Sequence, residues 1–167
     1  MALVDDLLAN NERFAASFHT GVALPIRPSR QLAVVACMDS RIDLFQVLGL
    51  GEGEAHIIRN AGGVVTDDVI RSLLLSQRLM GTTDIVLVHH TDCGMQKISG
   101  EQFKKEIERE TGIRPSFSIE SFDDPYADVR QSMARIMASP FLAHRTNVTG
   151  FVYEVETGRV IQATASA

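Results

Sequence analysis

Two apolar, β-branched runs, residues 32–36 and 85–88, are each followed closely by residues that can bind a metal ion. Such runs are typical of strands that are buried on both faces of a parallel sheet. If the two strands are neighbours, their carboxyl ends meet at one edge of the sheet, where the sites of α/β proteins lie. Cys37, which follows the first run, would then converge with His90 and Cys93, which follow the second.

The remainder of the chain alternates helical and extended patterns. Apolar periodicity and turn residues predict helices over 2–18, 42–48, 66–80, 100–111 and 125–138, and strands over 31–37, 55–59, 84–89, 148–156 and 159–163. This alternation predicts an α/β fold with a mainly parallel central sheet flanked by helices. The short turn at Gly158 predicts an antiparallel edge strand. The first helix precedes every strand, so we expect residues 1–20 to form an N-terminal helical arm that covers its own sheet or a partner subunit.

Length, charge and cysteine content narrow the class of protein. We expect 167 residues to form one domain, residues 1–167. A formal net charge of −5 argues against nucleic acid or an anionic membrane as a partner, because either would need a basic face. The first residues lack the pattern of a signal peptide and no apolar run reaches the ~18 residues of a membrane span, so we expect a cytoplasmic protein. Two cysteines are too few for a secreted disulfide framework, and a reducing compartment would leave them available to metal.

Cys37, His90 and Cys93 offer thiolate and imidazole donors, which zinc prefers. His90 and Cys93 are three positions apart, so one turn can bring both side chains to the same side. Three protein ligands leave a fourth position open, as in catalytic zinc sites. The pattern therefore favours a zinc enzyme that hydrates or hydrolyses its substrate, although His-x-x-Cys also occurs by chance and a cysteine after a strand is more often part of the core.

Asp39 and Arg41 strengthen the case for a catalytic site. In an extended loop, positions i and i+2 point the same way, so Arg41 can hold Asp39 ionised through a forked hydrogen bond. Beside a metal ion, Asp39 could accept a hydrogen bond from bound water. It could instead become the fourth ligand and close the site, more readily as the pH falls. The alternative is a solvated salt bridge that contributes little to stability.

Three short motifs together resemble the β-class carbonic anhydrases of the small prokaryotic type. They are Cys-x-Asp-x-Arg at 37–41, His-x-x-Cys-Gly at 90–94, and Arg-Asn-Ala-Gly at 59–62, which is similar to the characteristic turn of that family. The resemblance covers roughly residues 30–95 by motif, and the remaining elements agree with the family in their order. It implies an α/β protein that forms a homodimer or homotetramer, with the N-terminal helix often reaching onto the partner.

The resemblance also implies roles for the candidate residues. Cys37, His90 and Cys93 would bind Zn²⁺, and Asp39 with Arg41 would be the catalytic pair that controls the fourth position. The implied reaction is the reversible hydration of carbon dioxide to bicarbonate and a proton by a zinc-bound hydroxide. One alternative keeps this zinc site but hydrolyses carbonyl sulfide or carbon disulfide. Another is a non-catalytic protein, in which the two cysteines hold structural zinc or form a redox-active disulfide.

Two departures from the family pattern bear on the shape of the pocket, and therefore on the preferred substrate. His89 stands where the family usually has glycine, and Gly62-Gly63 stands where the family has Gly-Asn. We expect Gly62 and Gly63 to serve turn geometry first and substrate binding second. His89 could be a proton relay, a side chain that supports a metal ligand, or a packed histidine at the end of a strand, and the packed role is the more favoured.

Overall fold

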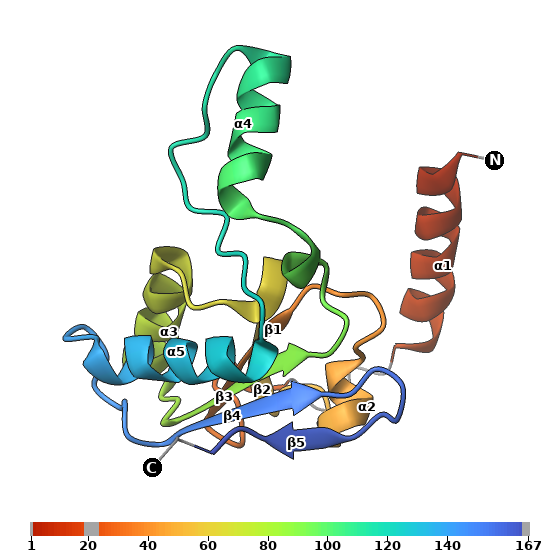
Figure 1. Cartoon of the computed structure of the whole chain (residues 1–167). Coiled ribbons are helices and arrows are strands. Elements are labelled where there is room, and N and C mark those ends of the chain that lie inside the picture. Colours follow the sequence, from red (N-terminus) through yellow and green to blue (C-terminus); the bar gives the residue numbers. More distant parts are fainter. Residues whose placement is uncertain (1, 19–23, 165–167) are drawn as a thin grey trace.

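Five strands form one twisted sheet in the computed structural model, which describes residues 2–18 and 24–164 (Figure 1). The order of the strands across the sheet is β2-β1-β3-β4-β5. Their bounds are β1 Leu32–Cys37, β2 Ala55–Asn60, β3 Asp84–His90, β4 Val148–Tyr153 and β5 Val160–Gln162. The first four strands are parallel and β5 pairs antiparallel with β4. The predicted α/β fold with an antiparallel edge is therefore confirmed, whereas the assignment of the whole chain to one domain stays a prediction.

The helices lie close to the ranges that the sequence predicts. Their bounds are α1 Leu3–Ser17, α2 Leu44–Leu48, α3 Asp67–Met80, α4 Gly100–Thr111 and α5 Pro125–Ala138, with short 3-10 turns η1 Ala61–Gly63 and η2 Gly94–Lys97. Helix α2 begins later than predicted because the Asp43 carboxylate accepts hydrogen bonds from two amides of its first turn. Strand β4 ends earlier than predicted because a turn closes there, in which the Gly158 amide donates to the Glu154 carbonyl.

The central strands are buried on both faces, which explains their continuous apolar sequence. In β1, Ala33 and Val35 pack in a cluster with residues of α3 and α5. Val34 and Ala36 point to the opposite face and pack in a second cluster, which includes Leu44 of α2 and both cysteines. This alternation fixes the register of β1 against its neighbours, because a slip of one residue would exchange the two faces.

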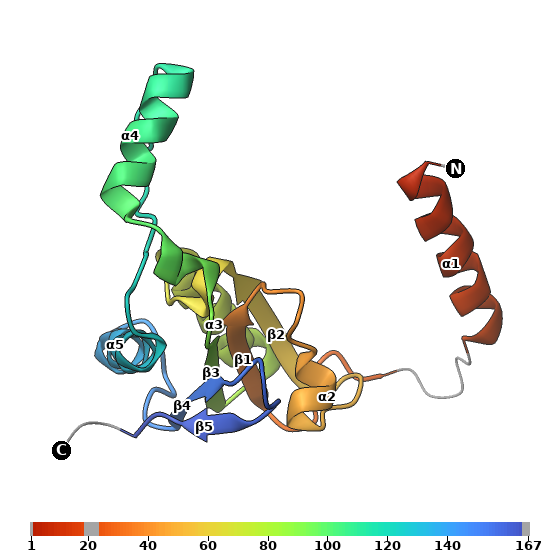
Figure 2. The same cartoon turned by 45° about the vertical axis from the view of Figure 1, so that its right-hand side comes forward.

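Two helices extend away from the sheet in both views (Figures 1 and 2). Helix α4 projects on the side of α5, and α1 stands apart from the sheet, so it does not cover the sheet of its own chain. Every residue of α1 is exposed except Ala9, which is half-buried. Residues 1, 19 and 20 of the predicted arm lie outside the described residues. Within the described part of the chain, no helix combines the length and the apolar character needed to cross a membrane.

Candidate metal centre

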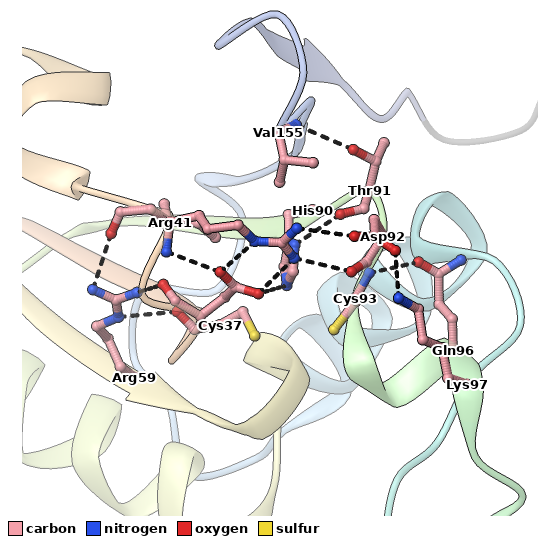
Figure 3. Close-up of polar contacts among 12 residues, drawn as sticks. Cys37, Arg41, Arg59, His90, Thr91, Asp92, Cys93, Gln96, Lys97 and Val155 are labelled. Carbon is pink, nitrogen blue, oxygen red and sulfur yellow. Dashed lines mark hydrogen bonds and ion pairs between the residues drawn. The ribbon is translucent and has the colours of Figure 1, made fainter.

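Two of the three candidate metal ligands lie at the ends of neighbouring parallel strands. Cys37 is the last residue of β1 and His90 is the last residue of β3, and the register pairs Ala36 with Val88. Cys93 follows after a tight turn in which Asp92 adopts a φ of +54°. Figure 3 shows the two cysteine side chains extending toward the same space from the two chain segments.

The three ligand atoms form a compact cluster that can hold a metal ion. The sulfur atoms of Cys37 and Cys93 and a ring nitrogen of His90 all lie within 4.8 Å of one another. Around a tetrahedral zinc ion such atoms are about 3.5–3.8 Å apart, since Zn–S is about 2.3 Å and Zn–N about 2.0 Å. All three residues are buried, with exposures of 4% for Cys37, 0% for His90 and 2% for Cys93.

The hydrogen bonds of His90 leave one ring nitrogen ready to bind a metal ion. Its Nδ1 atom lies 2.9 Å from the carbonyl oxygen of Thr91. A carbonyl only accepts hydrogen bonds, so Nδ1 carries the proton and Nε2 presents a lone pair. Among the described residues this buried Nε2 has no hydrogen-bond partner. An unpaired buried nitrogen is costly unless a ligand satisfies it, so the geometry fits a metal ion at this atom.

The two cysteines influence each other's protonation. Contact with the Cys93 side chain lowers the pKa of Cys37 to about 4, against the effect of burial. The same contact, together with burial, raises the pKa of Cys93. The backbone groups of Asp39 and Gly62 beside the Cys37 sulfur also lower its pKa. Cys37 is therefore a thiolate at neutral pH, and both cysteines are free of disulfide.

Asp39 and Arg41 form the forked pair that their spacing predicts. Arg41 donates from Nε to Asp39 Oδ1 at 2.9 Å and from Nη2 to Oδ2 at 2.8 Å. These bonds hold the pKa of Asp39 well below its usual range, so the carboxylate stays ionised. Asp39 Oδ2 lies 3.8 Å from His90 Nε2, which places the charge directly beside the candidate metal position.

Arg41 also joins the two segments that carry the ligands. Its Nη1 atom donates to the Asp92 carboxylate at 2.9 Å and its Nη2 atom donates to the Asp92 carbonyl at 3.0 Å (Figure 3). Lys97 contacts the other carboxylate oxygen of Asp92 at 2.6 Å. Asp92 thus fixes the loop between His90 and Cys93, a role that the sequence suggests only through the position of Asp92 between two ligands.

Arg59 holds the loop after β1, and the sequence gives little sign of this role. It donates to the carbonyl oxygens of Cys37 at 2.9 Å, Ile42 at 3.1 Å and Asp39 at 2.7 Å. Figure 3 shows its guanidinium beside Cys37. A planar fork of donors can satisfy three carbonyls in this way, which an ammonium group cannot do in the same geometry. The only signal for Arg59 in the sequence is its place in the Arg-Asn-Ala-Gly motif.

Gly62 and Gly63 are required by the backbone of the η1 turn. Their φ angles are +80° and +71°, in the left-handed region that favours glycine. A Cβ on Gly63 would lie 2.8 Å from the backbone nitrogen of Cys37, and a Cβ on Gly62 would lie within 3.2 Å of three side chains. These contacts explain why both positions are glycine by turn geometry, while their part in substrate binding stays a prediction.

His89 points away from its neighbour His90, because successive side chains of a strand alternate between faces. Its ring is fully buried, and Nε2 lies 2.7 Å from Asp128 Oδ2 on α5. The ring also packs against Phe122, with centroids 5.7 Å apart. These contacts agree with a packed histidine at the end of the strand; a role as a relay stays a prediction.

Fold and site together define a class of protein: an α/β protein with a metal-binding cluster of two sulfurs and one imidazole, beside an ionised Asp–Arg pair. Comparison with known proteins narrows this class. A family model described as carbonic anhydrase matches residues 32–119. β-Carbonic anhydrase 1 of Mycobacterium tuberculosis is 54% identical over 98% of this chain and 99% of its own length. The chain belongs to the carbonic anhydrase family, as a β-class member.

One solved structure and one further sequence relative extend the comparison. The crystal structure of a carbonic anhydrase from Streptococcus mutans matches with a TM-score of 0.91 and 38% identity, covering 98% of this chain and 99% of that one. A carbon disulfide hydrolase from Acidianus is 38% identical over 79% of this chain and 76% of its own length. The resemblance seen in the motifs is therefore confirmed over nearly the whole chain.

Proposed function

We propose that this chain binds Zn²⁺ through Cys37, His90 and Cys93 and catalyses the reversible hydration of carbon dioxide to bicarbonate and a proton. The observation that carries the proposal is the ionised Asp39, which Arg41 holds with Oδ2 3.8 Å from Nε2 of His90, an atom without a hydrogen-bond partner among the described residues. Neither a purely structural metal site nor a disulfide needs such a pair. The relative from M. tuberculosis, named a β-carbonic anhydrase, supports the same reaction.

The residues around the cluster have separate tasks in this reaction. A bound zinc ion would supply a nucleophile near neutral pH, because it lowers the pKa of water to about 7. Asp39 is an acceptor that cannot donate while it is ionised, so it can orient a water molecule beside His90 through a hydrogen bond. Arg41 keeps Asp39 ionised and fixes its direction. Arg59 helps to position Cys37, because its Nε atom donates to the Cys37 carbonyl oxygen.

Stopped-flow hydration of carbon dioxide by metal-quantified protein tests the proposal. We expect fast hydration that is lost on chelation and in Cys37→Ser, and strongly reduced in Asp39→Asn at unchanged zinc content. Asp68→Asn is the matched control, because Asp68 forms an exposed ion pair with Arg71 on α3. Zinc bound at about one per chain without hydration at any pH would contradict the proposal and favour a structural site.

A second candidate, hydrolysis of carbon disulfide or carbonyl sulfide at the same site, has one observation in its favour. A protein named carbon disulfide hydrolase is 38% identical to this chain, although over a smaller share of it than the relative named β-carbonic anhydrase. The same nucleophile would attack carbon in either molecule. Turnover of carbon disulfide without turnover of carbon dioxide would establish this alternative.

We also propose that the chain forms a homodimer or homotetramer through α1 and acts in the cytoplasm. Large apolar side chains of α1 remain exposed, among them Leu3 at 74%, Leu7 at 58% and Phe14 at 55%. A helix with such a surface is expected to pack against another subunit. Sedimentation of the full chain and of the Leu7→Glu/Phe14→Glu variant would decide: the variant should shift toward monomer, whereas an unchanged assembly would exclude α1 from the interface.

A further inference from the structure

Two half-buried apolar side chains, Met95 and Phe122, pack against the buried cluster of side chains that contains both cysteine ligands, Cys37 and Cys93. Met95 belongs to η2, two residues after Cys93, and its backbone lies near enough to the Cys93 thiol to lower the pKa of that group. Phe122 lies in the segment before α5, so it reaches the η1 turn from a distant part of the chain. We call Met95 and Phe122 together the apolar wall.

The apolar wall contacts the turn that supports the other cysteine. A Cβ placed on Gly62 would lie 3.1 Å from Phe122 Cε1 and 3.2 Å from Met95 Cγ. The backbone of Gly62 in turn lies near enough to the Cys37 thiol to lower its pKa. The wall therefore lies against the η1 turn at Gly62 and connects it to the η2 turn that follows Cys93, and the wall atoms nearest to Gly62 are carbon atoms.

The position of Phe122 is fixed from two sides. Its amide donates to the Met95 carbonyl at 3.4 Å, which ties the two parts of the wall together. On the other side its ring packs against His89, which is itself held by Asp128. A ring held by packing and backbone hydrogen bonds keeps a defined shape, as a surface that selects between similar substrates must.

We propose that the apolar wall determines the substrate specificity of this metal centre by limiting the size of the linear electrophile that approaches it. This inference rests on the proposed function and deepens it. Carbon dioxide and carbon disulfide are both linear and apolar, and they differ mainly in the larger sulfur atoms. A fixed apolar surface admits the smaller molecule and excludes the larger one by overlap, without a polar contact to either.

Truncating the wall tests this assignment. In Phe122→Ala and Met95→Ala, the ratio of kcat/KM for carbon disulfide to kcat/KM for carbon dioxide should rise at least about fivefold, a size expected when a pocket contact of one or more methylenes is removed. Phe117→Ala and Met137→Ala are matched controls, because Phe117 is 65% exposed and Met137 is 47% exposed. Zinc content and melting temperature are measured for each variant, so that a folding defect is recognised.

A binding measurement tests the role of the apolar wall independently of catalytic turnover. Cobalt-substituted protein is titrated with cyanate and with thiocyanate, linear anions that differ in one oxygen or sulfur atom, and binding is followed by visible absorption. In the wall variants, the affinity for thiocyanate divided by the affinity for cyanate should be at least about threefold higher than in the wild type. If neither the kcat/KM ratio nor the ratio of anion affinities changes more in the wall variants than in the control variants, the wall assignment is wrong and the proposed function stands. If the wild type turns over neither substrate, the proposed function fails and the anion ratio alone decides the wall.

Discussion

Replacing Gly63 by alanine should reveal how tightly the η1 turn is pressed against the strand that ends in Cys37. Gly63 has a φ of +71°, and its Cβ would lie 2.8 Å from the Cys37 nitrogen and 3.0 Å from the Ala36 carbonyl carbon. These atoms are backbone of the central strand β1, paired on both sides. They cannot move aside without shifting the strand itself.

The magnitude follows by comparison with a glycine that has the same backbone but open space. Gly81 ends α3 with a φ of +74°, and a Cβ built there meets nothing within 4 Å of it. Gly81→Ala should therefore lower the free energy of unfolding by about 1–2 kcal/mol, the cost of the left-handed conformation. Gly63→Ala adds overpacking of about 1–3 kcal/mol, for a total of about 2–5 kcal/mol. Gly62→Ala should fall between them, because its nearest neighbours are side-chain atoms at 3.0–3.2 Å, farther away than the backbone nitrogen at 2.8 Å from the Cβ at position 63.

Urea unfolding of the metal-free variants at one protein concentration measures these differences without a contribution from bound zinc. Zinc affinity is then measured separately, and it should fall in Gly63→Ala because the ligand Cys37 is displaced. Equal destabilisation by Gly63→Ala and Gly81→Ala, within about 0.5 kcal/mol, would refute the reasoning, since it would mean that β1 yields to the added methyl group at no cost.

Three further predictions concern the charged groups of the centre. Arg59→Met should destabilise the metal-free protein by about 1–3 kcal/mol in urea unfolding, because carbonyls of the loop after Cys37 lose their donor, whereas Arg71→Met should have little effect. Arg41 holds the pKa of Asp39 below about 3.9, the value of an aspartate in an unfolded chain. The Arg41–Asp39 pair therefore stabilises the fold fully above about pH 4, and this stabilisation is lost as the pH falls through the pKa of Asp39 in the folded state. The destabilisation by Arg41→Met should accordingly be larger at pH 7 than at pH 3, and an equal effect at both would show that the pair is not linked to proton binding. Zinc binding at pH 7 should release at least about one proton per ion, because the raised pKa of Cys93 keeps its thiol protonated in the metal-free protein. Calorimetry in buffers of different ionisation enthalpy measures this number, and a value of zero would contradict the prediction.

The sequence was sufficient for those parts of the fold and site that depend on local patterns. The β-branched runs before Cys37 and His90 identify the two strands whose ends meet, because a strand buried on both faces must be apolar throughout. The spacing of Asp39 and Arg41 likewise predicts their contact, since two residues of an extended loop share a direction.

The contacts that the sequence could not predict join segments far apart along the chain. Arg59 donates to carbonyl oxygens, which every residue possesses, so no residue type at the receiving end marks the contact. Gln96 donates to the carbonyl oxygen of Asp123, 27 positions away, again a backbone group. Phe122 follows a loop without periodicity, and its place beside Gly62 depends on how that loop folds back.

The division of the site between two strands has a consequence for the order of events during folding. Arg41 and Asp92, which join the two ligand segments, are 51 positions apart. Closing a loop of this size costs about 3–4 kcal/mol of chain entropy. Before β1 and β3 pair, only His90 and Cys93 are near enough in the chain to hold an ion together. Full metal affinity should therefore arise late, after the central strands have paired in the native register. A metal ion added during refolding would then stabilise molecules that have already folded, and it would leave the rate of the early folding steps unchanged.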